Sequence, residues 1–124
     1  MARLKRKSPL RRWGPRRGKF GAVPKSYGGR EYHSTKEARY AETLDQLRHA
    51  MHPRDRVAEW RPQVPVKLEV NGKLVTTYIC DFLVTFGDGR QEWHEVKGFE
   101  TETWKIKEKL FRALVPDRRL VVVK

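Results

Sequence analysis

Repeats of apolar residues predict two helices in the chain. Ser34 and Glu37 match a capping box, and apolar residues then recur at helical spacing as far as Met51, which predicts a helix over 35–51. A second helical repeat predicts a helix over 102–114. The residues expected to face inward on this second helix are Trp104, Ile106, Leu110, Phe111 and Leu114.

Apolar alternation predicts four strands. Pro62 and Pro65 place the first strand at a sheet edge or a bulge, and Asn71 with Gly72 forms a tight hairpin turn into the second. The last strand is a continuous apolar run, as in a buried strand. The predicted strands cover residues 64–70, 74–86, 91–97 and 120–123. The element order is therefore α-β-β-β-α-β, an α/β sandwich around a mixed sheet with flanking helices.

Strand periodicity brings polar groups onto an apolar sheet. Asp81 lies in the middle of the second predicted strand, and Glu95 and Lys97 share one face of the third. Unbroken alternation would place Asp81 with Ile79, Leu83 and Thr85, on the face opposite to Tyr78, Cys80, Phe82, Val84 and Phe86.

The hairpin between these strands decides whether the two acids meet. A three-residue loop at 87–89 makes Phe86 face Arg90 and Asp81 face Glu95. A two-residue loop would shift the register by one and send Asp81 to the other face. The sequence therefore predicts an odd loop or a bulge here.

Charge divides the chain into two regions. The net charge is +13, and residues 1–30 contain 11 of the 28 Lys and Arg residues and no acid. With glycines, prolines and no periodicity, this segment is predicted to be an irregular, flexible arm that binds nucleic-acid phosphates. Residues 31–124 form one predicted domain. Arm arginines expected to contact nucleic acid include Arg11, Arg12, Arg16 and Arg17.

Composition excludes several classes of protein. The single cysteine, Cys80, forms no intramolecular disulfide, and no zinc-ligand spacing is present. The basic start has no apolar segment after it, so we expect a soluble cytoplasmic protein without a membrane span. The arm's aromatic residues, Trp13, Phe20 and Tyr27, either stack on bases or pack onto the domain.

Two opposed carboxylates in an apolar sheet indicate a metal site. Their mutual repulsion and burial cost several kcal/mol without a counter-charge. Mg²⁺ resolves the conflict, since it needs only one or two carboxylates plus substrate phosphate. Lys97 would orient the attacking water or stabilise charge on the phosphate. Glu37 is the fourth candidate, because its helix position points it toward the sheet.

The chain resembles the core of the PD-(D/E)XK nucleases in the order of Asp81, Glu95-Val96-Lys97 and a following helix. Glu37 matches the glutamate of the preceding helix. Over residues 31–124 the chain is similar to small phage endonucleases related to Holliday junction resolvases. Cys80 stands where the superfamily motif has proline. The segments that carry the resemblance are Ser34–Arg39, Arg61–Gln63, Tyr78–Phe82, Glu95–Phe99 and Trp104–Phe111.

The resemblance implies a restriction-endonuclease-like fold and Mg²⁺- or Mn²⁺-dependent hydrolysis of branched DNA by a homodimer. It also implies the bacterial host cytoplasm as location if the chain is phage-encoded. Gln63 would contact a metal ligand or a metal-bound water at the substrate-binding site. The residues implied along the phosphate path are Lys105, Lys107, Lys109 and Arg112.

Other interpretations stay open from the sequence. Glu37 is equally explained as the partner of the Ser34 cap, and Lys97 as an ion-pair partner of Glu95. A non-catalytic DNA- or RNA-binding protein, an assembly adaptor or a general nuclease of the same fold would also suit the basic arm. The four histidines form no ligand set and are expected at the surface.

Overall fold

The computed structural model describes residues 25–124, which fall into two units that are divided between Ala38 and Arg39. In the first unit, β1 (Ser26–Tyr27) and β2 (Arg30–Glu31) pair as an antiparallel hairpin. Gly28 and Gly29 form its turn with φ of +61° and +82°, which glycine adopts without strain. Residues 1–24 of the predicted irregular arm lie outside the described residues, and its end forms this short hairpin, which strand periodicity could not predict because each strand has only two residues.

The helices differ in part from the predicted ones. Helix α1 (Thr35–Gln46) is followed by the 3₁₀ turn η1 (Leu47–His49), and Met51 is 92% exposed, so the predicted extension to residue 51 is wrong. Helix α2 (Glu102–Leu114) has the predicted bounds, and the Thr101 side chain accepts a hydrogen bond from the Trp104 N–H at its start. No helix within residues 25–124 is long and apolar enough to cross a membrane.

Ile106 was predicted to face inward on α2, but its side chain is 59% exposed. Trp104 and Phe111 are buried, and Lys107 is half-buried between them in the sequence. The inward side of α2 therefore follows residues 104, 107 and 111. Hydrophobicity alone would have placed Ile106 on this side and Lys107 in solvent.

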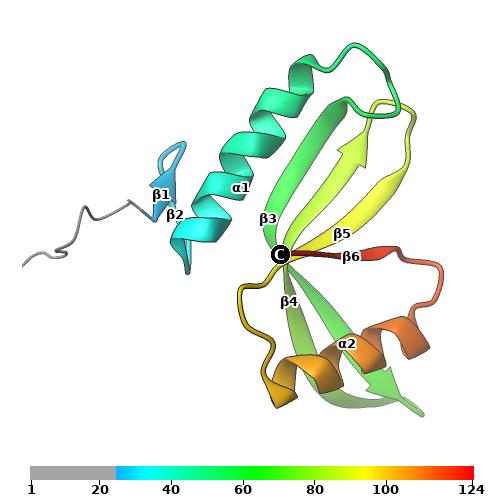
Figure 1. Cartoon of the computed structure of the whole chain (residues 1–124). Helices are drawn as coiled ribbons and strands as arrows, with labels where there is room; N and C mark the ends of the chain where they lie inside the picture. The colour runs from blue at the N-terminus through cyan, green and yellow to red at the C-terminus, as the bar shows by residue number, and fades with distance from the viewer. Residues whose placement is uncertain (1–24) are drawn as a thin grey trace, which may run out of the picture. The chain divides into compact units, whose positions relative to one another are not determined.

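The second unit contains a mixed four-stranded sheet in the order β3-β4-β5-β6 (Figure 1). Its first three strands are antiparallel, and β6 runs parallel to β5 after the α2 crossover. Strand β3, with its two prolines, lies at the edge as predicted. The strands are β3 (Val57–Val70), β4 (Lys73–Phe86), β5 (Gln91–Val96) and β6 (Leu120–Val123).

The register between β4 and β5 is the predicted one. Phe82 pairs with His94 and Thr85 with Gln91, so continuing the ladder places Asp81 opposite Glu95. The loop has three residues, and Gly89 takes the left-handed conformation at its end, with φ of +92°. A Cβ on Gly87 would lie 2.9 Å from the Pro53 carbonyl oxygen, so the first loop position requires glycine.

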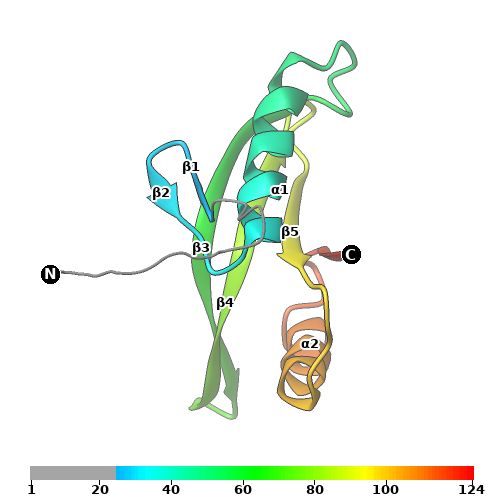
Figure 2. The same ribbon diagram turned by 60° about the vertical axis from the view of Figure 1, so that its left-hand side comes forward.

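Two groups of buried side chains meet along β4. Tyr78 and Cys80 belong to the cluster that Trp104 and Phe111 of α2 build, on the half of the β3–β4 ribbon that ends in the Asn71–Gly72 turn (Figure 2). Phe82 instead contacts Tyr40 of α1 and Trp60.

Alternation along β4 is interrupted at Asp81. Leu83 shares the α2 cluster with Cys80, although three positions separate them, so the prediction of unbroken alternation is wrong. The register places Gln63 across from Asp81, between the pairs Pro62–Phe82 and Val64–Cys80. Gln63 has φ of +55°, a left-handed conformation that is uncommon for a residue other than glycine. The side chains of β4 therefore change faces of the sheet at Asp81.

Gln63→Val should lower the free energy of unfolding by about 1–2 kcal/mol relative to Gln63→Asn, because β-branched residues tolerate left-handed backbone poorly and asparagine tolerates it well. Urea titration measures the difference. The control is the exposed strand residue Lys67, where Lys67→Val should be at least as stable as Lys67→Asn. Equal stability of the two Gln63 variants would contradict the strain.

Candidate metal and active site

Asp81 and Glu95 come together on neighbouring strands inside the second unit. The two residues are only 6% and 4% exposed. The Val96 backbone N–H donates a hydrogen bond of 2.8 Å to Asp81 Oδ2, which fixes this carboxylate beside the residue that follows Glu95. We refer to Asp81, Glu95 and Lys97 together as the carboxylate site.

Both oxygens of Glu95 have donors. The Tyr78 hydroxyl donates to Oε1 at 2.5 Å, and Lys97 Nζ lies 3.3 Å from Oε2. The same ammonium lies 5.1 Å from the centroid of the Trp104 ring, so a cation–π contact also holds it in place. The ion pair that the sequence allowed between Lys97 and Glu95 is therefore present.

The charge on Glu95 is unfavourable in its surroundings. Burial raises the pKa of its carboxyl above the ordinary value, and although the Tyr78 hydrogen bond and Lys97 lower it, the neighbouring Asp81 charge raises it further. The net direction is upward. The Tyr78 phenol and the Lys97 ammonium therefore do not fully compensate the burial of Glu95 beside Asp81.

Tyr78 is a site residue that sequence periodicity assigned only to the core. Burial, followed by the nearby Cys80 and Glu95, raises the pKa of its phenol, so the hydroxyl stays protonated and acts as a donor. Burial also raises the pKa of Cys80 to about 12, which makes this thiol a neutral core group as expected. The sequence signal that could have identified Tyr78 is its hydroxyl, because a buried tyrosine usually requires a hydrogen-bond partner.

A pocket of about 240 Å³ opens beside Glu95 and Lys97, at the start of α2. Lys107 lines it, so one lysine of the predicted phosphate path lies at the carboxylate site. Trp104 lines it too, and within the described part of the chain its Nε1–H is buried with no hydrogen-bond partner. We call this space the lysine pocket; its remaining wall consists of Thr77, Tyr78, Ile79, Thr101 and Thr103.

The other predicted phosphate contacts lie elsewhere. Lys105 pairs weakly with Glu102 at 3.7 Å, and Lys109 is exposed on the same helix. Arg112 pairs with Glu108 at 2.9 Å and lines a different pocket. The arm residues Arg11, Arg12, Arg16 and Arg17 lie outside the described residues.

Glu37 belongs to the first unit. Its backbone N–H donates to Ser34 Oγ at 3.1 Å, and its carboxylate accepts a hydrogen bond from the His33 N–H at 3.3 Å. The Ser34 half of the predicted capping box is therefore present, while the backbone donor to the Glu37 carboxylate is His33, one residue before Ser34. The side chain is buried as well, at 6% exposure.

The carboxylate site has the oxygen donors that Mg²⁺ prefers. Each carboxylate oxygen carries two lone pairs, so Tyr78 and Lys97 do not exhaust the acceptor capacity of Glu95. Among residues 25–124 no group of three or more His, Cys, Asp or Glu side chains gathers as a ligand set. Mg²⁺ requires only one or two carboxylates, so the pair fits that ion, and the raised pKa of Glu95 fits a missing positive charge.

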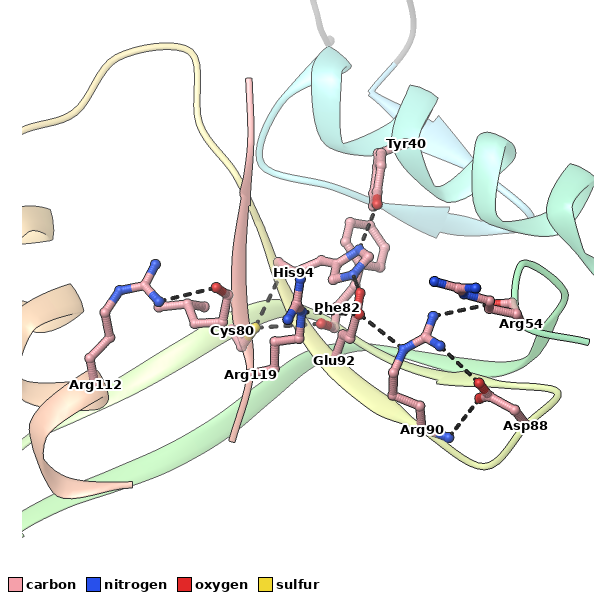
Figure 3. A network of polar contacts seen from close by, with 11 residues as sticks. Tyr40, Arg54, Cys80, Phe82, Asp88, Arg90, Glu92, His94, Arg112 and Arg119 are labelled. Atoms are coloured by element: carbon pink, nitrogen blue, oxygen red, sulfur yellow. Dashed lines mark hydrogen bonds and ion pairs between the residues drawn. The ribbon is translucent and has the colours of Figure 1, made fainter. Parts of the chain in front are cut away.

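A second polar network surrounds His94 on β5 (Figure 3). His94 Nδ1 meets the Tyr40 hydroxyl, and its Nε2 lies 2.9 Å from Glu92 Oε1. The expectation of a surface histidine is wrong for His94, which is 6% exposed, and right for His33, His49 and His52. Burial, despite Glu92, lowers the pKa of His94, so the neutral ring donates to Glu92 and accepts from Tyr40.

Comparison with known proteins identifies a family that covers most of the chain. A family model described as "Protein of unknown function (DUF1064)" matches residues 17–124. No curated protein and no solved structure is significantly similar to the chain.

Glu95→Gln should raise the free energy of unfolding of the metal-free protein at pH 8 above that of the wild type. The fold raises the pKa of Glu95, so the protonated carboxyl stabilises the protein. This contribution is fully present below the ordinary pKa of 4.5 and is lost as the pH rises through the raised pKa. Glutamine stays neutral and still accepts from Tyr78, so the gain should vanish below pH 4.5. Urea denaturation in EDTA at both pH values measures it.

Glu92→Gln is the matched control, two residues earlier on β5. Burial raises the pKa of Glu92, but hydrogen bonds from His94 and Arg90 outweigh it and the net direction is downward. This substitution should therefore destabilise the protein at pH 8. A stability loss in Glu95→Gln as well would contradict the charge imbalance at the carboxylate site.

Proposed function

We propose that this chain, which belongs to the DUF1064 family, is a metal-dependent DNA endonuclease that hydrolyses phosphodiester bonds at the carboxylate site. One observation supports this above the others: two buried carboxylates from adjacent strands oppose one another beside an ammonium group. A protein that needed only a stable sheet would gain from apolar residues at these positions.

Asp81 and Glu95 are the residues that would hold Mg²⁺, or Mn²⁺ in its place. The bound ion would supply the positive charge that polarises a phosphate and activates water. The chain's own contribution is to keep the ligands in place: the Val96 N–H orients Asp81, and the Tyr78 hydroxyl orients Glu95.

Lys97 is the proposed partner of the reacting phosphate. Its ammonium is held between Glu95 and the Trp104 ring and lines the lysine pocket. From there it would orient the attacking water or stabilise negative charge on the phosphate. Lys107, in the same wall, would bind the phosphate oxygens. Gln63, across from Asp81 in strained backbone, would keep the ribbon in register beneath the site.

Branched DNA, with a four-way junction as the leading case, is the proposed substrate, and a homodimer the proposed form. The resemblance to Holliday junction resolvases supports both the substrate and the dimer, since a four-way junction requires two symmetric cuts. The net charge of +13 supports a nucleic-acid partner in general. If the chain is phage-encoded, the bacterial host cytoplasm is the proposed place of action.

A non-catalytic DNA- or RNA-binding protein is the second candidate. The observation in its favour is that Asp81 and Glu95 both have hydrogen-bond partners within the fold, as structural acids would. Such a protein would bind nucleic acid equally well with and without metal and would cut none.

Asp81→Asn should abolish Mg²⁺-dependent cleavage, lowering the rate by more than about 100-fold, because the effect of a metal ligand exceeds that of the groups supporting it. Binding measured in EDTA should persist. The assay compares four-way, three-way, flap, duplex and single-stranded DNA and records whether cuts are symmetric. Glu69→Gln, an exposed acid on β3, should cleave like the wild type. Wild-type activity in Asp81→Asn would refute the proposed site.

Lys97→Ala should lower the single-turnover rate at saturating DNA by at least about tenfold and change the dissociation constant little, because its charge acts mainly on the reacting phosphate. Lys97→Arg should recover part of the rate. Rapid-quench kinetics and binding in EDTA separate the two quantities. A loss confined to affinity would reassign Lys97 to phosphate binding.

A further inference from the structure

A second basic pocket lies at the other end of α2, in the turn that leads into β6. Its volume is about 540 Å³, and three arginines and one aspartate line it, giving a net charge of +2. We call it the arginine pocket; it is lined by Arg112, Pro116, Asp117, Arg118, Arg119 and Leu120. Of these, Arg118 and Arg119 were not among the candidates that the sequence suggested.

Arg118 and Arg119 are held in place and yet open to solvent. Arg119 Nε lies 3.2 Å from Glu92 Oε2, while the side chain remains 70% exposed (Figure 3). The Arg118 guanidinium lies 5.1 Å from the centroid of the Trp93 ring. Since a guanidinium has five N–H donors, each arginine keeps donors for a ligand after its internal contact. Such preorganisation lowers the entropy lost on binding.

Arg112 has a different role in the arginine pocket. It donates to Glu108 on its own helix at 2.9 Å and to the Leu120 carbonyl at 3.3 Å. These contacts join the end of α2 to the start of β6. Arg112 therefore supports the wall of the pocket, and Arg118 and Arg119 present the free donors.

The arginine pocket is linked to the carboxylate site by the sheet. In the parallel pairing of β5 and β6, Leu120 lies opposite Trp93, and Val122 lies opposite Glu95. The pocket's edge is thus two residues along β6 from the level of Glu95, or about 7 Å.

The exposed side of α2 joins the two pockets by a second route. Lys105, Lys109 and Arg112 recur at helical spacing along it, and all three are exposed. The helix has 13 residues and is therefore about 20 Å long. DNA rises about 3.4 Å per base pair, so about six steps would cover that length.

We infer that the arginine pocket anchors the DNA phosphate backbone, through Arg118 and Arg119, several nucleotides away from the bond that is cut at the carboxylate site. The inference rests on the proposed function in taking DNA as the substrate. Phosphodiester oxygens suit the pocket because guanidinium groups bind them in pairs of parallel hydrogen bonds. Contacts of this kind bind without reading the base sequence.

The test uses full-length protein carrying Arg118→Gln and Arg119→Gln together, with binding to duplex DNA followed by fluorescence anisotropy in EDTA at several salt concentrations. The double variant should bind about tenfold more weakly at low salt, and the slope of log K against log salt should fall by about 2. The matched control is Lys67→Gln with Lys73→Gln on the exposed β3–β4 hairpin, which removes equal charge and should leave the slope unchanged.

Arg118→Gln alone guards against a folding defect, because Arg118 has no ion pair with Glu92 to lose; its slope should fall by about 1. A wild-type slope in both arginine variants, or an equal fall in the lysine control, would overturn the anchor. Cleavage assays separate the two proposals: if the wild-type protein binds with the expected slopes but cuts no DNA in Mg²⁺, the anchor stands and the nuclease proposal fails.

Discussion

Asp81 and Glu95 oppose one another because the loop between β4 and β5 has an odd number of residues. Gly87 lies too close to Pro53 for a side chain, and Gly89 adopts the left-handed conformation that closes a three-residue turn. Removing one loop residue would turn Asp81 to the other face. The chemistry proposed for this fold therefore depends on two glycines that contact neither acid.

The surroundings of the two acids balance attraction and repulsion closely. A main-chain N–H, a phenol and an ammonium each favour a carboxylate, while burial and the second negative charge oppose it. The balance stays unfavourable for Glu95. A site in this condition gains from any cation that enters it, and this gain is the physical basis of the nuclease proposal. Stability given up at one place is a common sign of function.

Local turn chemistry and strong periodicity made much of the second unit predictable. The Gly87–Gly89 loop fixed the register, and α2, β5 and β6 lie where their patterns placed them. The first half of β3 was missed because Val57–Arg61 mixes charged and apolar residues without alternation. Its strand conformation comes from pairing with the apolar end of β4, which is a long-range effect that sequence windows do not contain.

The polar contacts of core residues were harder to predict than the acids themselves. Two carboxylates in neighbouring apolar strands are conspicuous in a sequence, whereas Tyr78 was expected only in the core and His94 at the surface. Their partners lie 17 and 54 positions away in the chain. The break in alternation at Asp81 could not be predicted either. It accompanies the left-handed backbone of Gln63 on the neighbouring strand, and no residue type announces that conformation.

The turn of the ribbon at Asp81 has a consequence for how the second unit comes apart. Cys80 and Phe82 are two positions apart on one strand, yet the first packs with α2 and the second with Tyr40 and Trp60. Both groups of buried side chains therefore pack on β4, and loss of packing in either group would destabilise the other. Local opening confined to one half is disfavoured, so the unit should lose its structure in a single cooperative step.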